Sequence, residues 1–301
     1  MKEISVLGID LGASNFRIYS QKGKSSIRKK SPADFSDPER SILRRIREMV
    51  GEKNFDAIGV AVAGFVSSKE CRIIRMPNAG VEDIAICDLL RREFRCQKIT
   101  VMNDAVAAVY GEYSYQKVKE KDTLYLTFST GLGGAAMLND MVISGREGNS
   151  HEVGHIVIDS EGRVTCGCGG KGHWEAYCSG RGLVSFFRYF MKEMGEVRDE
   201  MPSTEDIFNF SRRGIKYYRQ FLKEAIRMNS AGLASVINVY APQLLIVGGP
   251  VALNNWDDYI LPSFRLARKG VVLEMPELRR SELADYASAY GAAKLAAKSV
   301  E

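Results

Sequence analysis

One short pattern occurs twice in this chain: an apolar strand, a turn of small residues and a returning strand. The first copy spans Ile4 to Tyr19 and turns at Gly12, and the second spans Thr123 to Leu138 with a turn at Gly131–Gly134. Strand and helix patterns alternate after the first copy, which predicts an α/β fold. A chain of 301 residues suffices for about two domains, so we expect two lobes with a cleft between them.

The predicted elements assign one copy of the pattern to each lobe. We expect a small N-terminal lobe of residues 1–117 plus 288–301 and a large lobe of residues 118–287. The glycine-rich stretch from His151 to Gly180 is expected to be irregular, because glycine favours turns and loops. The other expected helices are Pro38–Val50, Asp83–Phe94, Asp104–Tyr115, Ile215–Tyr240 and Ala287–Ser299, and the other expected strands are Ala57–Ala63, Ile99–Met102 and Leu244–Val247.

Composition and charge narrow the class of protein. Hydrophobic residues make up 45% of the chain and charged residues 26%, which is ordinary for a globular protein with a sizeable core. The net charge of +5 is spread along the chain, so we expect it to serve either solubility or attraction for anionic substrates such as nucleotides, and we expect no nucleic-acid partner. The sequence has no signal-peptide pattern and no apolar run of membrane length, so a cytoplasmic location without membrane contact is expected. The six cysteines do not form a dense disulfide framework, and metal binding is the better hypothesis for them.

The two turns carry residues suited to bind phosphate. Small residues let backbone amides approach an anion, and hydroxyl and amide side chains add donors. Asp10, at the end of the first strand, would hold Mg²⁺ through water. A simple hairpin turn is the alternative for either copy alone, whereas two facing turns would bind one polyphosphate. Neither turn has the GxGxxG spacing of a dinucleotide site. The candidate residues are Gly12, Ser14 and Asn15 in the first turn and Ser129, Thr130, Gly131 and Gly133 in the second.

Asp104 lies where an apolar strand ends and an alanine-rich helix begins. As a helix N-cap it would only satisfy backbone amides. As a general base it would accept the proton of an attacking hydroxyl. Phosphoryl transfer has a loose transition state in which that proton leaves late, so an ordinary aspartate suffices and its position matters more than its basicity. Both interpretations stay open on the residues alone.

All three histidines of the chain lie near a CxC pair in the glycine-rich stretch. Two imidazoles and two thiolates suit a closed tetrahedral Zn²⁺ site of the structural kind. The alternative is a reduced loop without metal, because the spacing is not that of a standard CxxC pair. Glu152 and Glu175 flank this stretch and would either accept hydrogen bonds from sugar hydroxyls or lie in solvent. The four candidate ligands are His155, Cys166, Cys168 and His173.

A pair of glycines, Gly248 and Gly249, follows the apolar strand near residue 247. A flat adenine ring could lie against backbone that such residues leave exposed. An ordinary turn is the alternative, because two glycines after a strand usually form one.

Taken together, these motifs resemble the ROK family of sugar kinases and repressors, which has the actin-like ATPase fold. DLGASN resembles the family's first phosphate motif, NDAVAAVYGE the start of its catalytic helix and STGLGG its second phosphate motif. HEVGH with CGCGGKGHWEAYCSG resembles its sugar and zinc signature, and LLIVGG resembles its adenosine turn. The five motifs occur in the family's order from Ile4 to Gly249, which is far more specific than any one of them.

The resemblance implies a kinase that uses ATP and Mg²⁺ to phosphorylate the 6-hydroxyl of a hexose. The sugar would be glucose or an N-acetylhexosamine such as N-acetylmannosamine, and the assembly would be a homodimer or homotetramer. Asp104 would be the base, a structural Zn²⁺ would bind the four ligands above, and the two turns with Asp10, Gly248 and Gly249 would bind ATP. The implied sugar contacts are Asn78, Asn103, Asp104, Glu152, His155 and Glu175.

Some positions depart from the family's pattern. His173 stands where the third zinc cysteine is usual, Ala63 replaces a common proline, and Pro250 replaces a third glycine. The stretch Ala79–Asp83 lacks the family's usual tryptophan. A zinc site of two histidines and two cysteines is chemically acceptable, and none of these departures touches Asn103 or Asp104.

Two other functions are alternatives to a kinase. A sugar-sensing repressor of this family carries a winged helix-turn-helix domain before the first phosphate motif, whereas only nine residues precede Asp10 in this sequence. A non-catalytic sugar-binding protein would not need Asp104 together with two intact turns. An enzyme is therefore the expected function.

Overall fold

The computed structural model describes residues 4–196 and 200–300. The contacts within the chain form two compact units, and each is described by itself. The first unit comprises the described residues of 1–123, 135–151 and 282–301, and the second comprises those of 124–134 and 152–281. The lobe boundaries expected from the sequence stay a prediction; the contacts group residues 135–151 and 282–287 with the first unit.

A five-stranded mixed sheet forms the centre of the first unit, in the order β3-β2-β1-β4-β8. Strand β2 runs antiparallel to β1 and to β3, whereas β4 runs parallel to β1 and β8 runs parallel to β4. The antiparallel hairpin at the start of the chain is therefore confirmed. The strands are β1 (Ser5–Leu11), β2 (Asn15–Lys22), β3 (Ser25–Pro32), β4 (Asn54–Val62) and β8 (Arg95–Asn103).

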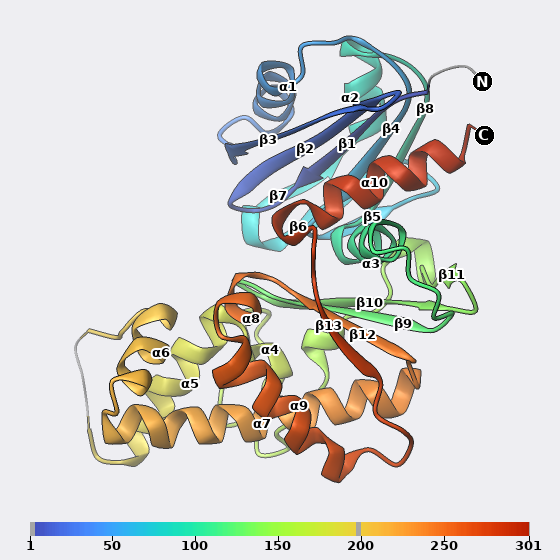
Figure 1. Ribbon diagram of the computed structural model, residues 1–301. Helices are drawn as coiled ribbons and strands as arrows, with labels where there is room; N and C mark the ends of the chain where they lie inside the picture. Colours follow the sequence, from blue (N-terminus) through green and yellow to red (C-terminus); the bar gives the residue numbers. More distant parts are fainter. Residues whose placement is uncertain (1–3, 197–199, 301) are drawn as a thin grey trace. The chain divides into compact units, whose positions relative to one another are not determined.

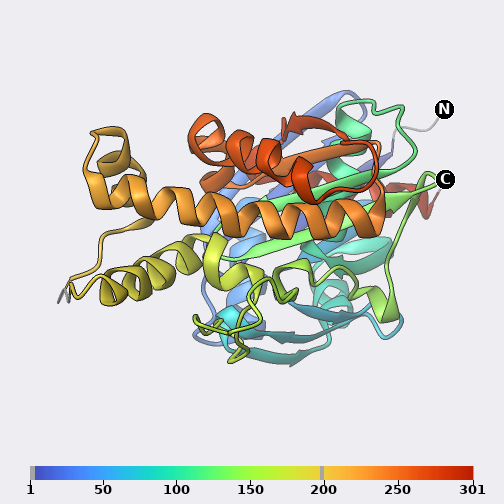
Figure 2. The same ribbon diagram turned by 90° about the horizontal axis from the view of Figure 1, so that it is seen from below.

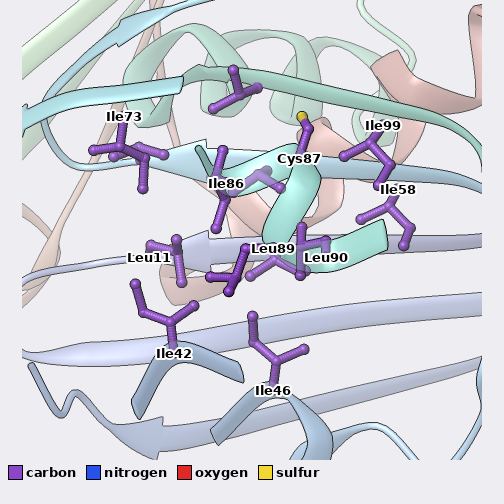
Figure 3. Close-up of a cluster of buried hydrophobic side chains, with 14 of the residues drawn as sticks. Leu11, Ile42, Ile46, Ile58, Ile73, Ile86, Cys87, Leu89, Leu90 and Ile99 are labelled. Carbon is purple, nitrogen blue, oxygen red and sulfur yellow. The ribbon is translucent and has the colours of Figure 1, made fainter. Parts of the chain in front are cut away.

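Alternating residues of the central strands face opposite sides of this sheet, because side chains along a strand alternate. One set packs in a buried apolar cluster with helices α1 (Pro38–Met49) and α2 (Ile86–Glu93), as Figure 3 shows. The other set is small and faces helix α10 (Ala287–Lys298), which lies along the sheet in Figure 1. Members of the first set include Leu7, Ile9, Leu11, Ile58, Val60 and Val62, and members of the second include Val6 and Ala57.

Helix α10 approaches the sheet at backbone distance. A Cβ atom on Gly8 would lie 1.8 Å from the carbonyl oxygen of Ala289, and one on Gly59 would lie 2.0 Å from that of Ala292. Any larger residue at these strand positions would collide with the helix backbone, which cannot move aside as a side chain can. Glycine is required here because of this close approach.

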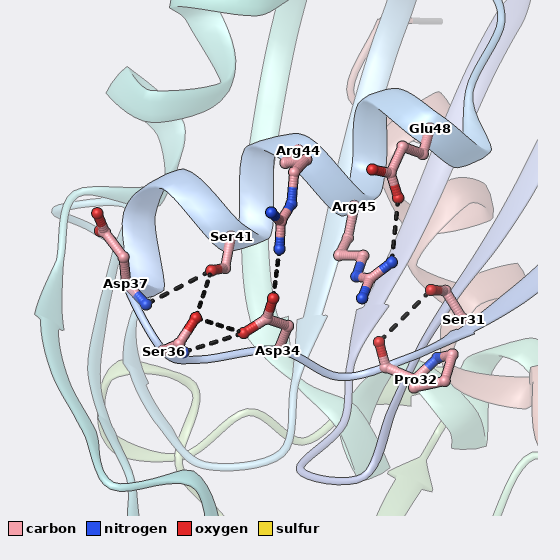
Figure 4. Close-up of polar contacts among 9 residues, drawn as sticks. All are labelled: Ser31, Pro32, Asp34, Ser36, Asp37, Ser41, Arg44, Arg45 and Glu48. Atoms are coloured by element: carbon pink, nitrogen blue, oxygen red, sulfur yellow. Dashed lines mark hydrogen bonds and ion pairs between the residues drawn. The ribbon is translucent and has the colours of Figure 1, made fainter.

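Polar contacts fix the start of helix α1 (Figure 4). Pro38 occupies the first helical turn, where its missing N–H costs nothing. The Asp37 side chain makes no capping hydrogen bond. Instead, Ser36 Oγ donates to Asp34 Oδ1 at 2.7 Å and lies 3.4 Å from Ser41 Oγ, while Arg44 Nη2 reaches Asp34 Oδ2 at 2.5 Å. The helix predicted from the proline and the apolar spacing is confirmed.

A small antiparallel sheet between β4 and α2 was not predicted. It contains β5 (Phe65–Ser67), β6 (Arg72–Met76) and β7 (Val81–Ile84). The helix predicted from Asp83 is therefore wrong at its start, because Asp83 lies in strand β7 with a positive φ of 53° and α2 begins only at Ile86. A disulfide joins Cys71 to Cys87, so one pair of cysteines does not follow the metal hypothesis.

A second five-stranded sheet has the order β11-β10-β9-β12-β13. Helix α7 is the long helix predicted near residues 215–240, and it extends across the second unit in Figure 2. The strands are β9 (Thr123–Phe128), β10 (Leu132–Leu138), β11 (Met141–Val142), β12 (Leu244–Gly248) and β13 (Glu277–Arg280). The helices are α3 (Asp104–Tyr115) in the first unit and α4 (Trp174–Cys178), α5 (Gly180–Glu193), α6 (Thr204–Arg212), α7 (Lys216–Tyr240), α8 (Pro250–Asn254) and α9 (Leu261–Ala267) in the second.

Trp174 ties α4 to α7 in the core of the second unit. Its indole Nε1 donates to Asn229 Oδ1 at 3.0 Å, and its ring fills the space where a Cβ atom on Gly232 would stand. The side chain is fully buried. This contact anchors the end of the irregular stretch that begins at His151, and that stretch contains α4 as its one regular α-helix among the described residues. No helix in the described ranges is long and apolar enough to span a membrane.

Replacing Gly59 by alanine tests the close approach of α10. The added methyl would meet the Ala292 carbonyl, so we expect the free energy of unfolding to fall by about 1–3 kcal/mol, as for other overpacked cores. Gly51→Ala is the matched control, because a Cβ atom there has nothing within 4 Å. Urea denaturation followed by circular dichroism measures both; equal midpoints for the two variants would contradict the packing described.

Candidate functional site

The first turn, Gly12–Asn15, closes the β1–β2 hairpin and contains a backbone hydrogen bond. Gly12 N donates to Asn15 O at 3.2 Å. A Cβ atom on Gly12 would lie only 2.8 Å from Asn15 O, so the tight turn needs glycine. Ser14 is exposed at its tip, and Asn15 is partly buried. The turn is thus a small-residue loop whose side-chain donors remain accessible for an anion.

Asp10 is a buried carboxylate beside this turn. The register of the hairpin pairs it with Arg17, and Arg17 Nη1 donates to Asp10 Oδ2 at 3.2 Å. Burial raises the pKa of Asp10 to about 7, although Arg17 lowers it in part, and the negative charge of Asp104 adds to the increase. Asp10 and Asp104 are therefore close enough to interact, as two carboxylates of one site would be.

Arg17 was not among the predicted site residues. It bridges Asp10 to Asp285, which Arg17 Nη2 approaches at 3.4 Å and to which Lys30 Nζ donates at 2.8 Å. The sequence does indicate this residue: Arg17 follows Asp10 by seven residues across a short hairpin turn, so the two residues stand opposite each other in the paired strands. Pairing the residues of the two predicted strands would have identified Arg17 as the partner of Asp10.

Helix α3 begins at Asp104, and Asn103 rather than Asp104 is its N-cap. The Asn103 side-chain oxygen accepts from Ala105 N at 2.9 Å and from Val106 N at 3.4 Å. Its side-chain nitrogen donates to Gly64 O at 3.3 Å. Asp104 Oδ1 also accepts from Ala105 N at 2.9 Å, as the first residue of the helix. Because Asn103 satisfies the amides of the helix start, the capping explanation for Asp104 loses most of its force.

The rest of α3 is held firmly against α10 and the segment that precedes it. Gly111 and Gly291 let the two helices touch, since Cβ atoms on them would lie 2.4 Å from Ala287 O and 1.8 Å from Ala107 O. The fully buried Glu112 accepts from Leu283 N at 3.0 Å and from the neighbouring amide of residue 282 at 3.1 Å. Asp104 therefore stands at the end of a rigid element.

The second turn, Ser129–Gly131, is shorter than predicted. Gly133 and Gly134 lie within β10 and not in the turn. Glycine is needed at position 134 because a Cβ atom there would lie within 2.9 Å of side-chain atoms of Leu126 and Val153. Ser129 N donates to Gly131 O at 2.9 Å. Thr130 is exposed at the tip. This turn joins β9 to β10 in the same way that the Gly12–Asn15 turn joins β1 to β2.

A cavity of about 640 Å³ adjoins the second turn. Its size suits a nucleotide, since small-molecule sites occupy about 300–1,000 Å³. Arg181, Val184, Ser185 and Arg188 lie on one face of α5 and supply two cationic side chains to it, which sequence reasoning missed although their spacing of three, four and seven residues is that of a helix face. The other lining residues are Ser129, Thr130, Gly180, Ser203, Thr204, Pro250 and Val251.

The predicted glycine pair lies next to this cavity. Gly248 ends β12, and Gly249 follows with a φ of 86°, a backbone conformation that favours glycine. A Cβ atom on Gly249 would lie 2.3 Å from Phe128 O, so the chain passes close to the end of β9. Pro250, which lines the cavity, begins helix α8. The pair therefore immediately precedes two of the lining residues, Pro250 and Val251.

The four predicted zinc ligands come together, and we call them the metal cluster. One ligand atom from each of His155, Cys166, Cys168 and His173 lies within 4.8 Å of all the others. Tetrahedral Zn²⁺ with Zn–S of about 2.3 Å and Zn–N of about 2.0–2.1 Å separates its ligands by roughly 3.3–3.8 Å, so a small adjustment would close this shell. The donor set fits zinc.

The segment that carries the metal cluster is tied to α4. Asp159 accepts a short hydrogen bond from Tyr177 Oη, and Val164 N donates to the same hydroxyl oxygen at 3.0 Å. Arg163 Nε adds a hydrogen bond to Asp159 Oδ2 at 3.0 Å. Glu152, which is exposed, accepts from or shares a proton with His155 Nδ1 at 2.9 Å. Such a carboxylate partner orients a ligating imidazole.

Asn78 belongs to the first unit. It lies in the short 3₁₀ turn Pro77–Ala79 of the small sheet and is exposed, ahead of Gly80, which has a φ of 65°. Its predicted contact with a sugar stays a prediction.

Comparison with known proteins decides the family of this arrangement. The sequence matches the ROK family over residues 6–299, almost its whole length. The chain belongs to the ROK family. The prediction made from the five motifs is confirmed, as is the actin-like ATPase fold of this family.

Individual known proteins are similar to this chain over most of their lengths. The chain is 37% identical to a glucokinase of Pyrobaculum calidifontis over 299 residues, covering 98% of this chain and 96% of the relative. It is 31% identical to a glucokinase of Aeropyrum pernix over 274 residues, covering 83% of each. Among solved structures, a ROK hexokinase from Thermus thermophilus has a TM-score of 0.79 at 29% identity and covers 98% of this chain and 99% of its own.

The raised pKa of Asp10 predicts how stability changes with pH. The folded chain binds a proton at Asp10 that the unfolded chain releases above its usual pKa of 3.8, so this contribution to stability is complete below pH 3.8 and is lost as pH rises to about 7. Asp10→Asn removes it. Relative to the variant, the unmodified chain should lose on the order of 4 kcal/mol between pH 4 and pH 7.

Asp285→Asn is the control for that experiment, because Asp285 contacts the same arginine but Lys30 and Arg17 lower its pKa despite partial burial. Its contribution has the opposite sign and is lost as pH falls. Urea denaturation at a series of pH values measures both, and parallel curves for Asp10→Asn and the unmodified chain would contradict the pKa of Asp10.

Proposed function

We propose that this chain is a kinase that transfers the γ-phosphate of ATP to the 6-hydroxyl of glucose. The observation that carries the proposal is the start of helix α3, where Asn103 caps the helix and leaves Asp104 at its first position beside Asp10. Glucokinases among the similar proteins support glucose as the sugar. An N-acetylhexosamine such as N-acetylmannosamine is the alternative sugar.

Asp104 acts as the general base in this proposal. Its carboxylate accepts the proton of the sugar hydroxyl as that oxygen attacks the γ-phosphorus, and the bond from phosphorus to the β–γ bridging oxygen breaks. The leaving group is ADP. Since the proton leaves late in a loose transition state, the fixed position of Asp104 on α3 contributes more than a raised pKa would. The anchoring of α3 by Gly111, Glu112 and Gly291 supports such a fixed position.

The proposed nucleotide site lies in the second unit, where the 640 Å³ cavity with Arg181 and Arg188 supports it and the second turn would bind phosphate. In the first unit, the proposed phosphate-binding residues are those of the Gly12–Asn15 turn. Asp10 is a hard oxygen donor suited to Mg²⁺ through water, and its pKa of about 7 leaves it partly ionised at neutral pH and ionised at higher pH. A bound Mg²⁺ would neutralise charge that develops on the phosphate oxygens.

The metal cluster holds a structural Zn²⁺ in this proposal. With two thiolates and two neutral imidazoles the shell is closed, so the metal stabilises the loop from Glu152 to His173 and takes no part in the chemistry. Asn78, Asn103, Glu152, His155 and Glu175 are the proposed contacts to the sugar.

The central test of the proposal is Asp104→Asn. Loss of the base should reduce ATP-dependent phosphorylation of glucose by about 10²- to 10⁴-fold, while the affinity for glucose survives because the amide keeps the shape of the side chain. A coupled assay of ADP release measures turnover, and calorimetry measures glucose binding. Turnover close to that of the unmodified chain would refute the assignment of the base.

A second test concerns the metal. We expect about one zinc per chain in freshly purified protein, and loss of that zinc in Cys166→Ser or Cys168→Ser, because three remaining ligands bind zinc far more weakly. Cys96→Ser is the control, since Cys96 lies in the first unit and outside the metal cluster. Elemental analysis decides the matter; absence of zinc from the unmodified chain would rule out the site.

A further inference from the structure

Glu175 lies between the metal cluster and the second turn. Its Oε2 atom accepts from Leu132 N, the amide that follows the turn, at 2.9 Å. Its Oε1 atom accepts from Cys166 Sγ at 3.4 Å. A Cβ atom on Gly131 would stand 2.7 Å from Oε2, so the carboxylate lies directly against the turn. One side chain thus contacts both a candidate metal ligand and the backbone expected to bind phosphate.

A second contact joins the same two features from the other end of the metal loop. Gly154 precedes the ligand His155, and a Cβ atom on it would lie 2.2 Å from Leu132 O. The backbone of the metal loop is therefore pressed against the carbonyl of the residue whose amide Glu175 binds. A displacement of either ligand would move one of these contacts, because His155 adjoins Gly154 and His173 is two residues before Glu175.

The chain beyond Glu175 adds two backbone hydrogen bonds to the turn. Gly180 N donates to Ser129 O at 2.7 Å, and Arg181 N donates to Thr130 O at 3.2 Å. Ser179 connects this segment to Glu175, since Ser179 Oγ donates to Glu175 O at 2.8 Å. With these carbonyls occupied, the turn holds one conformation, with Thr130 exposed at its tip.

We infer that Glu175 is a positioning residue that couples the metal cluster to the second turn, so that nucleotide affinity depends on the bound metal. The inference rests on the proposed function, because it takes the turn to bind nucleotide phosphates. A metal that fixes His155 and His173 also fixes Gly154 and Glu175, which are one and two residues from these ligands. The turn is then preorganised, and less binding free energy is lost in ordering it. Without the metal, the loop and the turn loosen together.

This role differs from the proposed contact of Glu175 with the sugar. A sugar contact changes the affinity for glucose and leaves the binding of a nucleotide in the absence of sugar unaltered. Coupling through Leu132 N changes nucleotide binding with no sugar present. Calorimetric titration with MgADP alone therefore separates the two roles and needs no catalysis.

Three single variants test the coupling in zinc-loaded protein. Glu175→Ala leaves Leu132 N without its acceptor and should weaken MgADP binding about tenfold, the effect of losing one hydrogen bond to a charged group. Glu175→Gln keeps an acceptor oxygen for that amide and should bind MgADP within about threefold of the unmodified chain. Glu161→Ala, an exposed glutamate of the same loop, is the matched control and should change nothing.

A double-mutant cycle with Cys168→Ser tests the dependence on metal. Cys168→Ser, with its zinc loss confirmed by elemental analysis, should weaken MgADP binding about as much as Glu175→Ala, and the two changes together should add less than about threefold to either alone. If the cysteine variant does not fold, removal of zinc from the unmodified chain by a chelator replaces it. Circular dichroism verifies folding in each case.

Three results would overturn the inference. Zinc-loaded and zinc-free protein could bind MgADP equally, the two changes could be fully additive, or Glu175→Ala could bind MgADP as the unmodified chain does. Failure of the unmodified, zinc-loaded chain to bind MgADP at all would overturn the proposed function as well, which keeps the two failures distinct.

Discussion

Helix α10 lies so close to the first sheet that its backbone occupies the space of any side chain at Gly8 or Gly59. The same helix touches α3 through Gly111 and Gly291, again at backbone distance. Sheet, α10 and α3 therefore form one block in which small sliding movements are blocked by hard contacts. Asp10 ends one strand of this block and Asp104 begins α3. The interaction between the two carboxylates is a consequence of this packing.

The second unit reaches a comparable rigidity by different means. Its turn at Ser129–Gly131 is held by hydrogen bonds from Glu175 and from the backbone at Gly180 and Arg181. These groups lie on the segment that follows the metal cluster, and Trp174 anchors that segment in the core. Rigidity in the first unit comes from glycine contacts, and in the second from polar contacts whose geometry a bound metal would control.

Much of this arrangement could be predicted from the sequence because its signals are local. Asp104 stands at a change from strand to helix pattern, so both the start of α3 and its end at Tyr115 were predicted correctly. The second strand pair was also predicted, but Gly133 and Gly134 were wrongly assigned to its turn. They lie in β10, where neighbouring side chains fill the space beside Gly134. Local propensity cannot distinguish these two uses of glycine.

What could not be predicted depends on residues far apart in the chain. The pairing of Cys71 with Cys87 follows from how the small sheet meets α2, and nothing in the spacing of the cysteines indicates it. Arg181 and Arg188 line the cavity only because α5 folds beside the second turn, and the sequence does not indicate that contact. Likewise, Glu175 was predicted as a sugar contact, and its hydrogen bond to Leu132 N joins residues 43 positions apart.

The central claim is that this chain transfers phosphate from ATP to the 6-hydroxyl of a hexose, with glucose as the sugar. The most direct measurement is the identity of the product formed from glucose, ATP and Mg²⁺, determined by phosphorus and proton nuclear magnetic resonance, with N-acetylmannosamine and N-acetylglucosamine as competing sugars. We expect one product, glucose phosphorylated at O6, formed together with an equal amount of ADP. Hydrolysis of ATP without a sugar phosphate, or phosphate at another hydroxyl, would contradict it.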